Sequence, residues 1–385
     1  MLVLWWKKRT QKKFANQKML EKLAPNSSTF KSVLKLIFLL IGISFLIILV
    51  NYVFYVAIKT KKVSFAIGGV LILALQFTLG WLMMINVWES GEKVKVAIIQ
   101  ENIPAQLRWD ENLSDSIIEY YYLSPLKEAV DYKPNLILWS ETAIPWKFYQ
   151  DDKLVYEALN ISWPAQAGHI MGIHSEVPNQ KEISFNSAYY IHPNGDISGR
   201  YDKTYPLTFL ESSLFDTQTF GDWSLSFINE SLQKIKVGTR PNVLKSPYGK
   251  IGMSICNESV LGFHIRKSVK EGANYLMVMS NDAWFANTKL PYYHFTHSII
   301  RAVENRRDVA VNSNGGYAAI INASGKVLTE NKSDHPAVVV GKLSKRSNKT
   351  FYTSYGDVFS IACLGFVALF ALFMFIKTNN KRDIL

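Results

Sequence analysis

Three residues that can carry covalent chemistry occur in the order Glu141, Lys203 and Cys256. Each follows a short apolar run or lies in the loop after one, within the segments ILWSETAIPW, GRYDKTYPLTFLE and IGMSICNES. A cysteine attacks only as a thiolate, and a free thiol with a pKa of about 8.5 needs a base or a positive field to become one. A carboxylate can take the thiol proton and return it to a leaving group. A fixed ammonium can stabilise an oxyanion.

Together the three residues predict a nucleophile (Cys256), a general base (Glu141) and an oxyanion-stabilising cation (Lys203). Each also has an ordinary explanation when taken singly: a buried structural cysteine, an acid at a helix start or in a loop, and a solvated lysine. A helix predicted over residues 260–271 favours the chemical interpretation, because its unpaired N–H groups would face the thiolate.

The segment 92–344 must position these residues, and it alternates short β-branched runs with longer mixed segments, which predicts an α/β domain. Strands are predicted at 94–100, 136–139, 169–174, 188–191, 251–256, 275–280, 309–312, 318–321 and 338–341. The Asn194-Gly195 and Ser324-Gly325 pairs are typical of hairpin turns. Helices are predicted where the apolar spacing returns to about 3.6, over 113–130, 260–271 and 293–306. The irregular stretch 211–241 is expected to be a surface excursion.

Three apolar stretches are long enough to cross a bilayer, which takes roughly 20 residues. They divide the chain into a basic N-terminal segment (1–33), two transmembrane helices (34–58 and 64–87), the catalytic domain (92–344), a third transmembrane helix (358–376) and a basic tail (377–385). The domain then lies on the same side as the N-terminal segment, where charge counting mildly favours the cytosol. An alternative is that residues 1–6 are the stub of a further helix.

The net charge of +12 belongs to the ends of the chain. The first 62 residues hold twelve Lys or Arg against one acid, and the basic tail has a surplus of two, which leaves about −1 for everything between. The domain therefore has no basic excess for binding nucleic acid. The second cysteine, Cys363, lies inside the last apolar stretch, so no disulfide framework is implied.

The ordered motifs resemble the nitrilase (carbon–nitrogen hydrolase) superfamily, and the apolar stretches narrow the resemblance to the apolipoprotein N-acyltransferase family. The matching segments are IQENIPAQLRWDE, LWSETAIPW, YDKTYPLTFLE, ICNES, SNDAWF, RAVENRR and NSNGGYAAIINASG. The resemblance implies a four-layer αββα nitrilase-like sandwich that faces the periplasm, with flanking transmembrane helices. It also implies Glu141 as general base, Lys203 as oxyanion-stabilising cation and Cys256 as the acyl-carrying nucleophile.

The resemblance carries over further residues that support substrate binding. These are Trp109 in LRWDE, Glu211 after the lysine motif, and Glu258 two places after the cysteine. Asn257 stands where the family usually has a tyrosine, so an aromatic wall beside the nucleophile is missing. This departure bears on rate or acyl preference and leaves the thiol chemistry intact.

The implied reaction moves a fatty acyl group from phospholipid, through a thioester on Cys256, to the amino group of the N-terminal diacylglyceryl-cysteine of a lipoprotein. A thioester divides this transfer into two easier steps. We expect a monomeric, multi-pass enzyme of the bacterial inner membrane with neither cofactor nor metal, whose partners are the phospholipid donor, the diacylglyceryl-modified apolipoprotein and the membrane, with no nucleic acid.

Two other functions remain open. One is a membrane-anchored amidase of the same superfamily, which would use the same three residues and end with water as the acceptor. The other is an inactive truncated relative that binds lipid or lipoprotein. The second arises because family members carry several more membrane helices before the catalytic domain, so either the chain starts late or it is a reduced relative.

Other polar residues are assigned structural roles. His294, His297 and Glu304 fall on one predicted helix, but their spacing is not HExxH and predicts no metal site. Arg301 and Glu304 lie three apart and predict an ion pair. Asp282 in SNDAWF is expected to shape the pocket loop.

Overall fold

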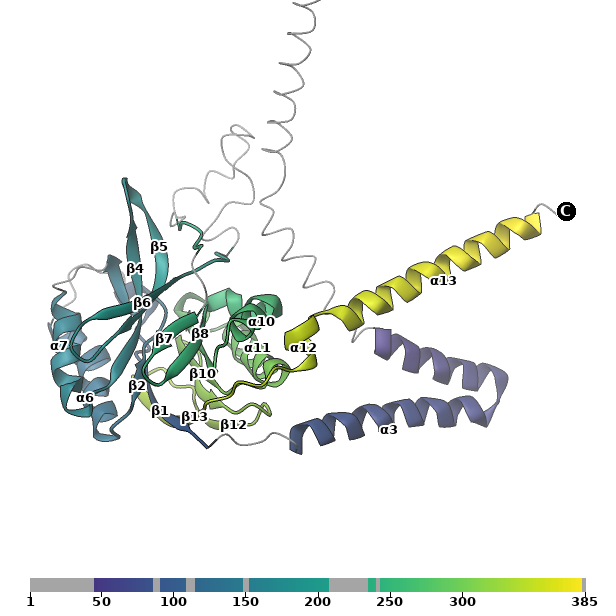
Figure 1. Cartoon of the computed structure of the whole chain (residues 1–385), viewed down its shortest axis with the longest axis horizontal. Coiled ribbons are helices and arrows are strands. Elements are labelled where there is room, and N and C mark those ends of the chain that lie inside the picture. Colours follow the sequence, from purple (N-terminus) through teal and green to yellow (C-terminus); the bar gives the residue numbers. More distant parts are fainter. Residues whose placement is uncertain are drawn as a thin grey trace, which may run out of the picture.

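Two stacked β-sheets form the centre of the protein (Figure 1). The computed structural model describes residues 45–85, 91–108, 115–147, 152–207, 235–239 and 243–382. In spatial order, the first sheet consists of β13 (Ala337–Ser344), β1 (Lys93–Gln100), β2 (Leu136–Leu138), β4 (Gly168–Val177), β5 (Gln180–Ile191) and β6 (Ile197–Asp202), with β3 (Ile144–Lys147) also beside β4. The second sheet consists of β12 (Val327–Asn331), β11 (Ala318–Ile321), β10 (Val309–Asn314), β9 (Tyr275–Asn281), β8 (Gly249–Ile255) and β7 (Val243–Ser246).

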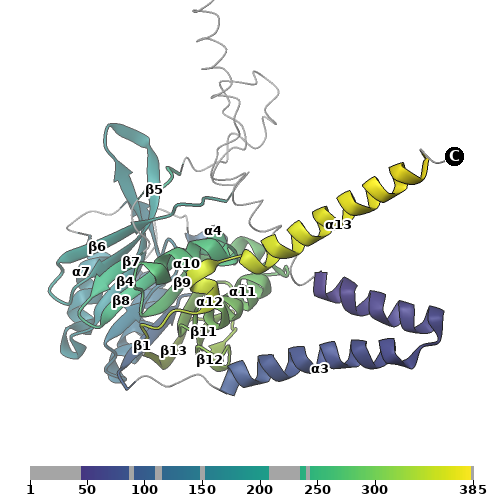
Figure 2. The same ribbon diagram turned by 45° about the vertical axis from the view of Figure 1, so that its right-hand side comes forward.

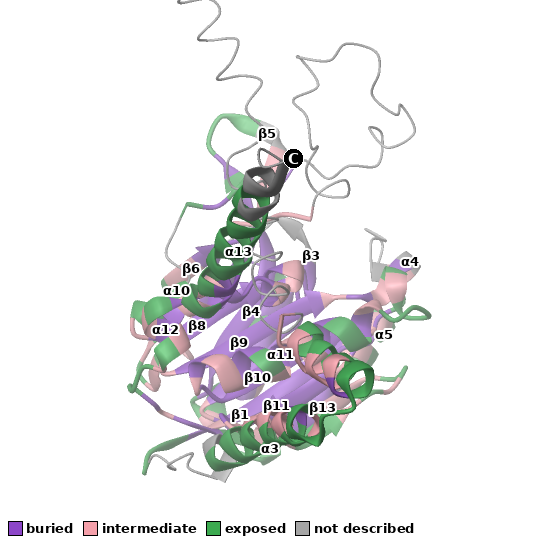
Figure 3. Ribbon diagram, turned by 90° about the vertical axis from the view of Figure 1, so that its right-hand side faces the viewer, coloured by how far each residue is buried: buried purple, intermediate pink, exposed green. Residues whose placement is uncertain are grey.

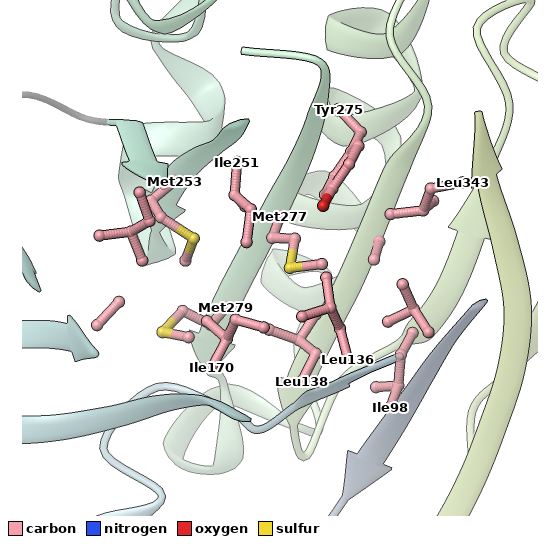
Figure 4. Packing of buried hydrophobic residues seen from close by; sticks show 14 of the residues in the cluster. Ile98, Leu136, Leu138, Ile170, Ile251, Met253, Tyr275, Met277, Met279 and Leu343 are labelled. Carbon is pink, nitrogen blue, oxygen red and sulfur yellow. The ribbon is translucent and has the colours of Figure 1, made fainter. Parts of the chain in front are cut away.

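The sheets face each other across an apolar layer (Figure 4). β1 directs Val96 and Ile98 into this layer and turns Ala97 and Ile99 to its other face, where they join a second cluster. Successive side chains of a strand point to opposite faces. Because both faces of the central parallel strands are buried, these strands are almost continuously apolar in sequence.

Helices cover the outer faces of both sheets. α6 (Ser124–Asp131) and α7 (Lys153–Ser162) bury Leu126 and Ala158 against the first sheet. α10 (Gly262–Lys270) and α11 (Leu290–Asn305) bury Ile265 and Ala302 against the second. The layers therefore follow the order helix, sheet, sheet, helix, and the predicted four-layer αββα sandwich is confirmed.

The nine predicted strands are all present, and both predicted turns join antiparallel neighbours, β5 with β6 and β11 with β12. Sequence reasoning missed β3, β6, β7, β12 and α7. β12 shows why, since it is largely exposed and has no apolar run. The predicted helix over 113–130 is three pieces in its described part, namely α5 (Asp115–Ile118), the π-helical η1 (Glu119–Leu123) and α6. Of the predicted excursion 211–241, residues 235–239 are described.

Apolar helices project from the sandwich (Figures 1 and 2). They are Phe45–Thr60, α3 (Val63–Ile85) and α13 (Val358–Arg382), and most of their apolar side chains are exposed (Figure 3). By length and composition, Val63–Leu82 and Val358–Ile376 are suited to cross a membrane. Residues 34–44 and 86–87 of the predicted transmembrane stretches lie outside the described residues.

A short helix, α12 (Phe351–Tyr355), joins the sandwich to α13. Arg266 of α10 donates from Nε to the carbonyls of Tyr352 and Thr353 at 2.9 Å, and from Nη2 to the carbonyl of Ser354 at 3.0 Å. The last carbonyls of a helix have no partner within it. One guanidinium therefore satisfies them and fixes the point from which α13 departs.

A buried histidine organises the strand end that leads to Glu141. The Trp139 indole N–H donates to His169 Nδ1 at 3.0 Å, so Nδ1 is the unprotonated nitrogen. His169 Nε2 must then carry the proton and donate to Ser162 Oγ at 2.7 Å. Burial lowers the pKa of His169 to about 3, so the ring stays neutral in the folded protein.

This arrangement predicts an acid-labile fold. The unfolded chain takes up a proton on His169 below its ordinary pKa of about 6.5, whereas the folded chain does not. Stability is therefore present above pH 6.5 and is lost as the pH falls toward 3, by about 2–3 kcal/mol at pH 4.5 for this residue. His169→Gln keeps an acceptor and a donor without titrating.

We expect the free energy of unfolding of the wild type to fall by about 2–3 kcal/mol more than that of His169→Gln between pH 7.5 and 4.5. Denaturant unfolding in detergent at both pH values measures the difference. The exposed His335→Gln serves as the control and should keep the wild-type pH dependence. Equal pH dependence in His169→Gln and the wild type would contradict the assignment.

Candidate active site

Glu141 is a buried carboxylate just beyond the end of β2, with 4% of its surface exposed. Its Oε1 accepts from Lys203 Nζ at 2.9 Å and from Asn186 Nδ2 at 2.8 Å. Its Oε2 accepts from the backbone N–H of Asn281 at 2.9 Å. Three donors, one of them an ammonium, favour the ionised carboxylate. The structure therefore brings together the acid and the lysine that the sequence singled out.

The Glu141 loop lies directly on β4, and Gly172 makes this possible. A Cβ atom at Gly172 would lie 2.4 Å from the Ser140 carbonyl oxygen, 2.7 Å from the Thr142 nitrogen and 2.9 Å from the Glu141 Cα. Thr142 itself has a φ of 52°, which is rare for a β-branched residue. Backbone contact and a strained turn thus hold Glu141 in place.

Lys203 follows β6 and is held by its backbone as well as by its ammonium. Its N–H donates to the Asn186 carbonyl at 2.8 Å, and its carbonyl accepts from the Gly238 N–H at 2.8 Å. A Cβ atom at Gly238 would lie 2.2 Å from the Asp202 carbonyl oxygen, so only glycine permits this approach. The lysine side chain is 1% exposed.

Cys256 follows β8 and is half-buried, with a φ of 55°. Non-glycine residues adopt this left-handed region rarely, and such strain clusters at functional sites. The chain then forms a 3₁₀ turn, η4 (Cys256–Val260), in which Ser259 Oγ donates to the Cys256 carbonyl at 2.9 Å. The helix predicted over 260–271 is present as α10, which begins two residues later, at Gly262, because the 3₁₀ turn η4 occupies Cys256–Val260.

Glu258 ties the cysteine turn to the lysine loop. Its buried Oε2 accepts from the Ile255 N–H at 2.9 Å. Its Oε1 accepts from the hydroxyl of Tyr201 at 2.7 Å and from the backbone N–H groups of Thr204 and Tyr205 at 2.7 and 3.0 Å. This residue therefore fixes the exits of β8 and β6 relative to each other, which is a positioning role.

The surroundings of Glu258 are held in defined charge states. Burial raises the pKa of Tyr201, and the Glu258 charge adds to the shift. Burial lowers the pKa of His264 and outweighs the opposing effect of Glu258, 3.6 Å away. A neutral imidazole and a protonated phenol thus surround the carboxylate, and the phenol can donate to it.

A second carboxylate lies beside the thiol. Cys256 Sγ, a carboxylate oxygen of Asp282 and a ring nitrogen of His294 lie within 4.8 Å of one another. His294 Nδ1 is 2.9 Å from Asp282 Oδ1. These donor atoms are close enough to hold a metal ion, but the Asp282–His294 hydrogen bond already accounts for the cluster, and we assign no metal to it.

Consecutive residues at the end of β9 connect the two halves of the site. The Asn281 N–H is bound to Glu141, and the Asp282 carboxylate lies within 4.8 Å of Cys256 Sγ. Glu141, Lys203 and Cys256, which are far apart in sequence, therefore converge on one end of the sandwich. Their catalytic roles remain predictions.

The remaining residues singled out in the sequence are partly described by the structure. Asn257 is half-buried within η4, and Trp109 and Glu211 lie outside the described residues. The Arg301–Glu304 ion pair is confirmed at 3.2 Å. Burial raises the pKa of Glu304 to about 7. His294 was assigned to helix packing, whereas its ring contacts Asp282 beside the thiol.

Sequence reasoning missed two residues that anchor the carboxylate. Asn186 lies in the middle of β5 between Phe185 and Ser187, and only its burial in the folded structure marks it. Asn281 acts through its backbone N–H, which no side-chain pattern reveals.

A resemblance to known proteins agrees with this geometry. Residues 95–349 match the family described as carbon-nitrogen hydrolase, and the chain belongs to this family. It is similar to the apolipoprotein N-acyltransferase of Geobacter metallireducens, with 28% identity over 87% of this chain and 65% of the relative. It is also similar to the apolipoprotein N-acyltransferase of Coxiella burnetii, with 24% identity over 80% of this chain and 62% of the relative. The chain thus spans slightly less than two-thirds of these two relatives.

Solved structures resemble the chain more distantly. One is Nit3 of Saccharomyces cerevisiae, a member of the nitrilase superfamily. The superposition covers 66% of this chain and 91% of the Nit3 chain, at 15% identity and with a TM-score of 0.47. Another is a mutant amidase from Nesterenkonia sp. AN1. The superposition covers 68% of this chain and 93% of the amidase chain, at 16% identity and with a TM-score of 0.48.

Gly172→Ala should destabilise the sandwich through the Glu141 loop. The added methyl group meets backbone atoms that cannot move aside independently, at a cost of about 1–3 kcal/mol. For a domain of this size, we expect the melting temperature to fall by about 2–10 °C. Gly91→Ala is the control because no atom lies within 4 Å of its Cβ position. An unchanged melting temperature in Gly172→Ala would refute the close approach.

The Glu141–Lys203 pair should be strongly coupled. Lys203→Met leaves a buried carboxylate without its ammonium, which typically costs about 3–5 kcal/mol. Removing both charges in Glu141→Gln/Lys203→Met should cost less than Lys203→Met alone. Denaturant unfolding of the wild type, both single variants and the double variant completes the cycle. Additive effects would show that the two side chains do not interact.

Proposed function

We propose that this protein transfers a fatty acyl group from phospholipid, through a thioester on Cys256, to the amino group of a diacylglyceryl-cysteine lipoprotein. One observation carries the proposal: a buried Glu141–Lys203 pair, 2.9 Å apart, is joined through Asn281 and Asp282 to a cysteine in a strained turn. The names of the similar bacterial N-acyltransferases support the choice of donor and acceptor.

In the first step, the Cys256 thiol gives its proton to Glu141 and its sulfur attacks the ester carbonyl of the phospholipid. Lys203 stabilises the negative charge on the carbonyl oxygen. The C–O bond breaks, Glu141 returns the proton to the departing lysophospholipid oxygen, and the acyl group stays on sulfur. In the second step, the lipoprotein amine attacks the thioester, a C–N bond forms, and the C–S bond breaks.

The apolar helices support a location in the bacterial inner membrane. α3 and α13 carry spans suited to a bilayer, and both project from the sandwich. Anchoring at both ends of the domain would hold Cys256 close to the lipid surface, so acyl chains need not cross water. We propose that the domain faces the periplasm, where its lipoprotein acceptors would be found.

Cys256→Ala should abolish the reaction, by at least about 1,000-fold, because it removes the sulfur that holds the acyl chain. Cys256→Ser should lose nearly as much. The measurement is the mass of a reporter lipoprotein incubated with the purified protein and phospholipid, in which a third acyl chain adds a defined mass. Cys363→Ala is the matched control, since this cysteine lies in α13.

Three results would count against the proposal. Undiminished acylation by Cys256→Ala would overturn the thioester mechanism. An acyl label that forms on Cys256 but leaves as free fatty acid, with no mass gain on the lipoprotein, would indicate an amidase-like hydrolase. A wild-type protein that takes no hydroxylamine-sensitive label from an alkyne-tagged phospholipid would indicate a protein that only binds lipid.

A further inference from the structure

We infer that His294, oriented by Asp282, is a second acid–base group of the active site and accepts the proton of the lipoprotein amine in the transfer step. This inference rests on the proposed function and divides the two half-reactions between two proton carriers. Glu141 would serve the loading of Cys256, and His294 would serve its unloading.

The geometry around His294 is that of an oriented base. Asp282 Oδ1 accepts from His294 Nδ1, 2.9 Å away, because an ionised carboxylate can only accept. Ser280 Oγ donates to the same oxygen at 3.1 Å, and Ser313 Oγ donates to Oδ2 at 2.7 Å. The carboxylate is therefore fixed on both oxygens. It holds the imidazole in the tautomer whose Nε2 is basic, as the acid does in a Ser–His–Asp triad.

The position of His294 suits an incoming nucleophile. A ring nitrogen of His294 lies within 4.8 Å of Cys256 Sγ, so the imidazole is beside the atom that carries the acyl group. An amine attacking the thioester carbon must fit beside the sulfur, and a base needs to be about 3 Å from that nitrogen. A ring beside the sulfur is in the region where such a base has to lie. Both Asp282 and His294 are buried.

Glu141 has hydrogen-bond partners of its own. Its carboxylate is stabilised by an ammonium, an amide and a peptide N–H, and each of these bonds favours the charged form over the protonated one. Imidazole is the side chain that most often carries out proton transfer in enzymes.

The charged groups around His294 come from three elements. Cys256 faces it from η4, and Asp282 faces it from the end of β9. His297 and Arg301 lie on α11 itself, and burial together with the positive Arg301 lowers the pKa of His297. His297 therefore stays neutral at pH 7, which leaves Asp282 as the charged partner in direct contact with the ring.

The neutral amine forms a C–N bond to the thioester carbon, and the extra proton on nitrogen passes to His294. The C–S bond then breaks, the electron pair leaves on Cys256 as a thiolate, and the amide is released. The imidazolium returns its proton to the thiolate, which restores the thiol for the next phospholipid. No outside oxidant, reductant or metal takes part.

The experiment follows the two steps separately on the full chain in detergent. An alkyne-tagged phospholipid labels Cys256, and a synthetic diacylglyceryl-cysteine peptide is then added as the acceptor. In His294→Asn, we expect labelling within about threefold of the wild-type rate and transfer slowed by about 100-fold, because acid–base catalysis contributes 10²–10⁴-fold. The labelled protein should accumulate. Added imidazole should restore part of the transfer rate to His294→Ala.

Matched variants separate chemistry from structure. His297→Asn removes a histidine one turn along the same helix and should transfer at the wild-type rate. Asp282→Asn keeps the shape of the side chain but loses the charge that orients the ring. It should therefore accumulate protein labelled on Cys256, as His294→Asn does, and it replaces His294→Asn as the test if His294→Asn folds poorly. Melting temperatures identify folded variants.

Two outcomes would overturn the role of His294 and leave the proposed function standing. One is transfer at the wild-type rate in folded His294→Asn and Asp282→Asn. The other is an equal loss of labelling and transfer without rescue by imidazole. A wild type that labels Cys256 but never acylates the peptide would contradict the proposed function as well. The two failures are therefore distinguishable.

Discussion

A buried carboxylate that must be compensated on both oxygens is the constraint on which the site depends. Glu141 receives Asn186 from β5, Lys203 from the end of β6 and the Asn281 N–H from β9. The first two donors belong to one sheet and the third to the other. Desolvating an unpaired carboxylate would cost several kcal/mol, so the charge is acceptable only once the two sheets have stacked. The site and the sandwich therefore form together.

The ion pair is better explained by chemistry than by stability. Apolar residues of similar volume often replace buried ion pairs at no cost to folding. Strain points the same way, since Thr142 and Cys256 both hold left-handed backbone conformations at strand ends. Asn102, after β1, does so too. A buried charge and several strained turns at one end of the sheets lower the stability of the fold. Such features are common at functional sites, where they hold side chains in a required geometry.

The sequence revealed elements whose signal is local. The central strands are apolar on both faces, and Glu141 and Cys256 lie just beyond two of them, β2 and β8, so their placement at strand ends could be predicted. Lys203 follows the edge strand β6, which has no such apolar run. β12 could not be predicted, because it is largely exposed and forms a strand through its pairing with β11. The role of Asn281 depends on which strand ends meet across two sheets. His294 and Asp282 lie on different elements twelve residues apart, and helical spacing within 293–306 could not reveal their contact.

The segment after the nucleophile also connects chemistry to the membrane. α10 follows η4 directly, and its Gly262 leaves room for two neighbours, since a Cβ atom there would lie 2.2 Å from Arg301 Nη1 and 2.6 Å from the Tyr352 hydroxyl. Arg266, one turn later, holds the last carbonyls of α12. The path from Cys256 to α13 therefore runs through α10 and the hydrogen bonds of the Arg266 side chain to α12. If α13 crosses the bilayer as proposed, the thiol has a fixed height above it, and the lipid substrate is the component that must move.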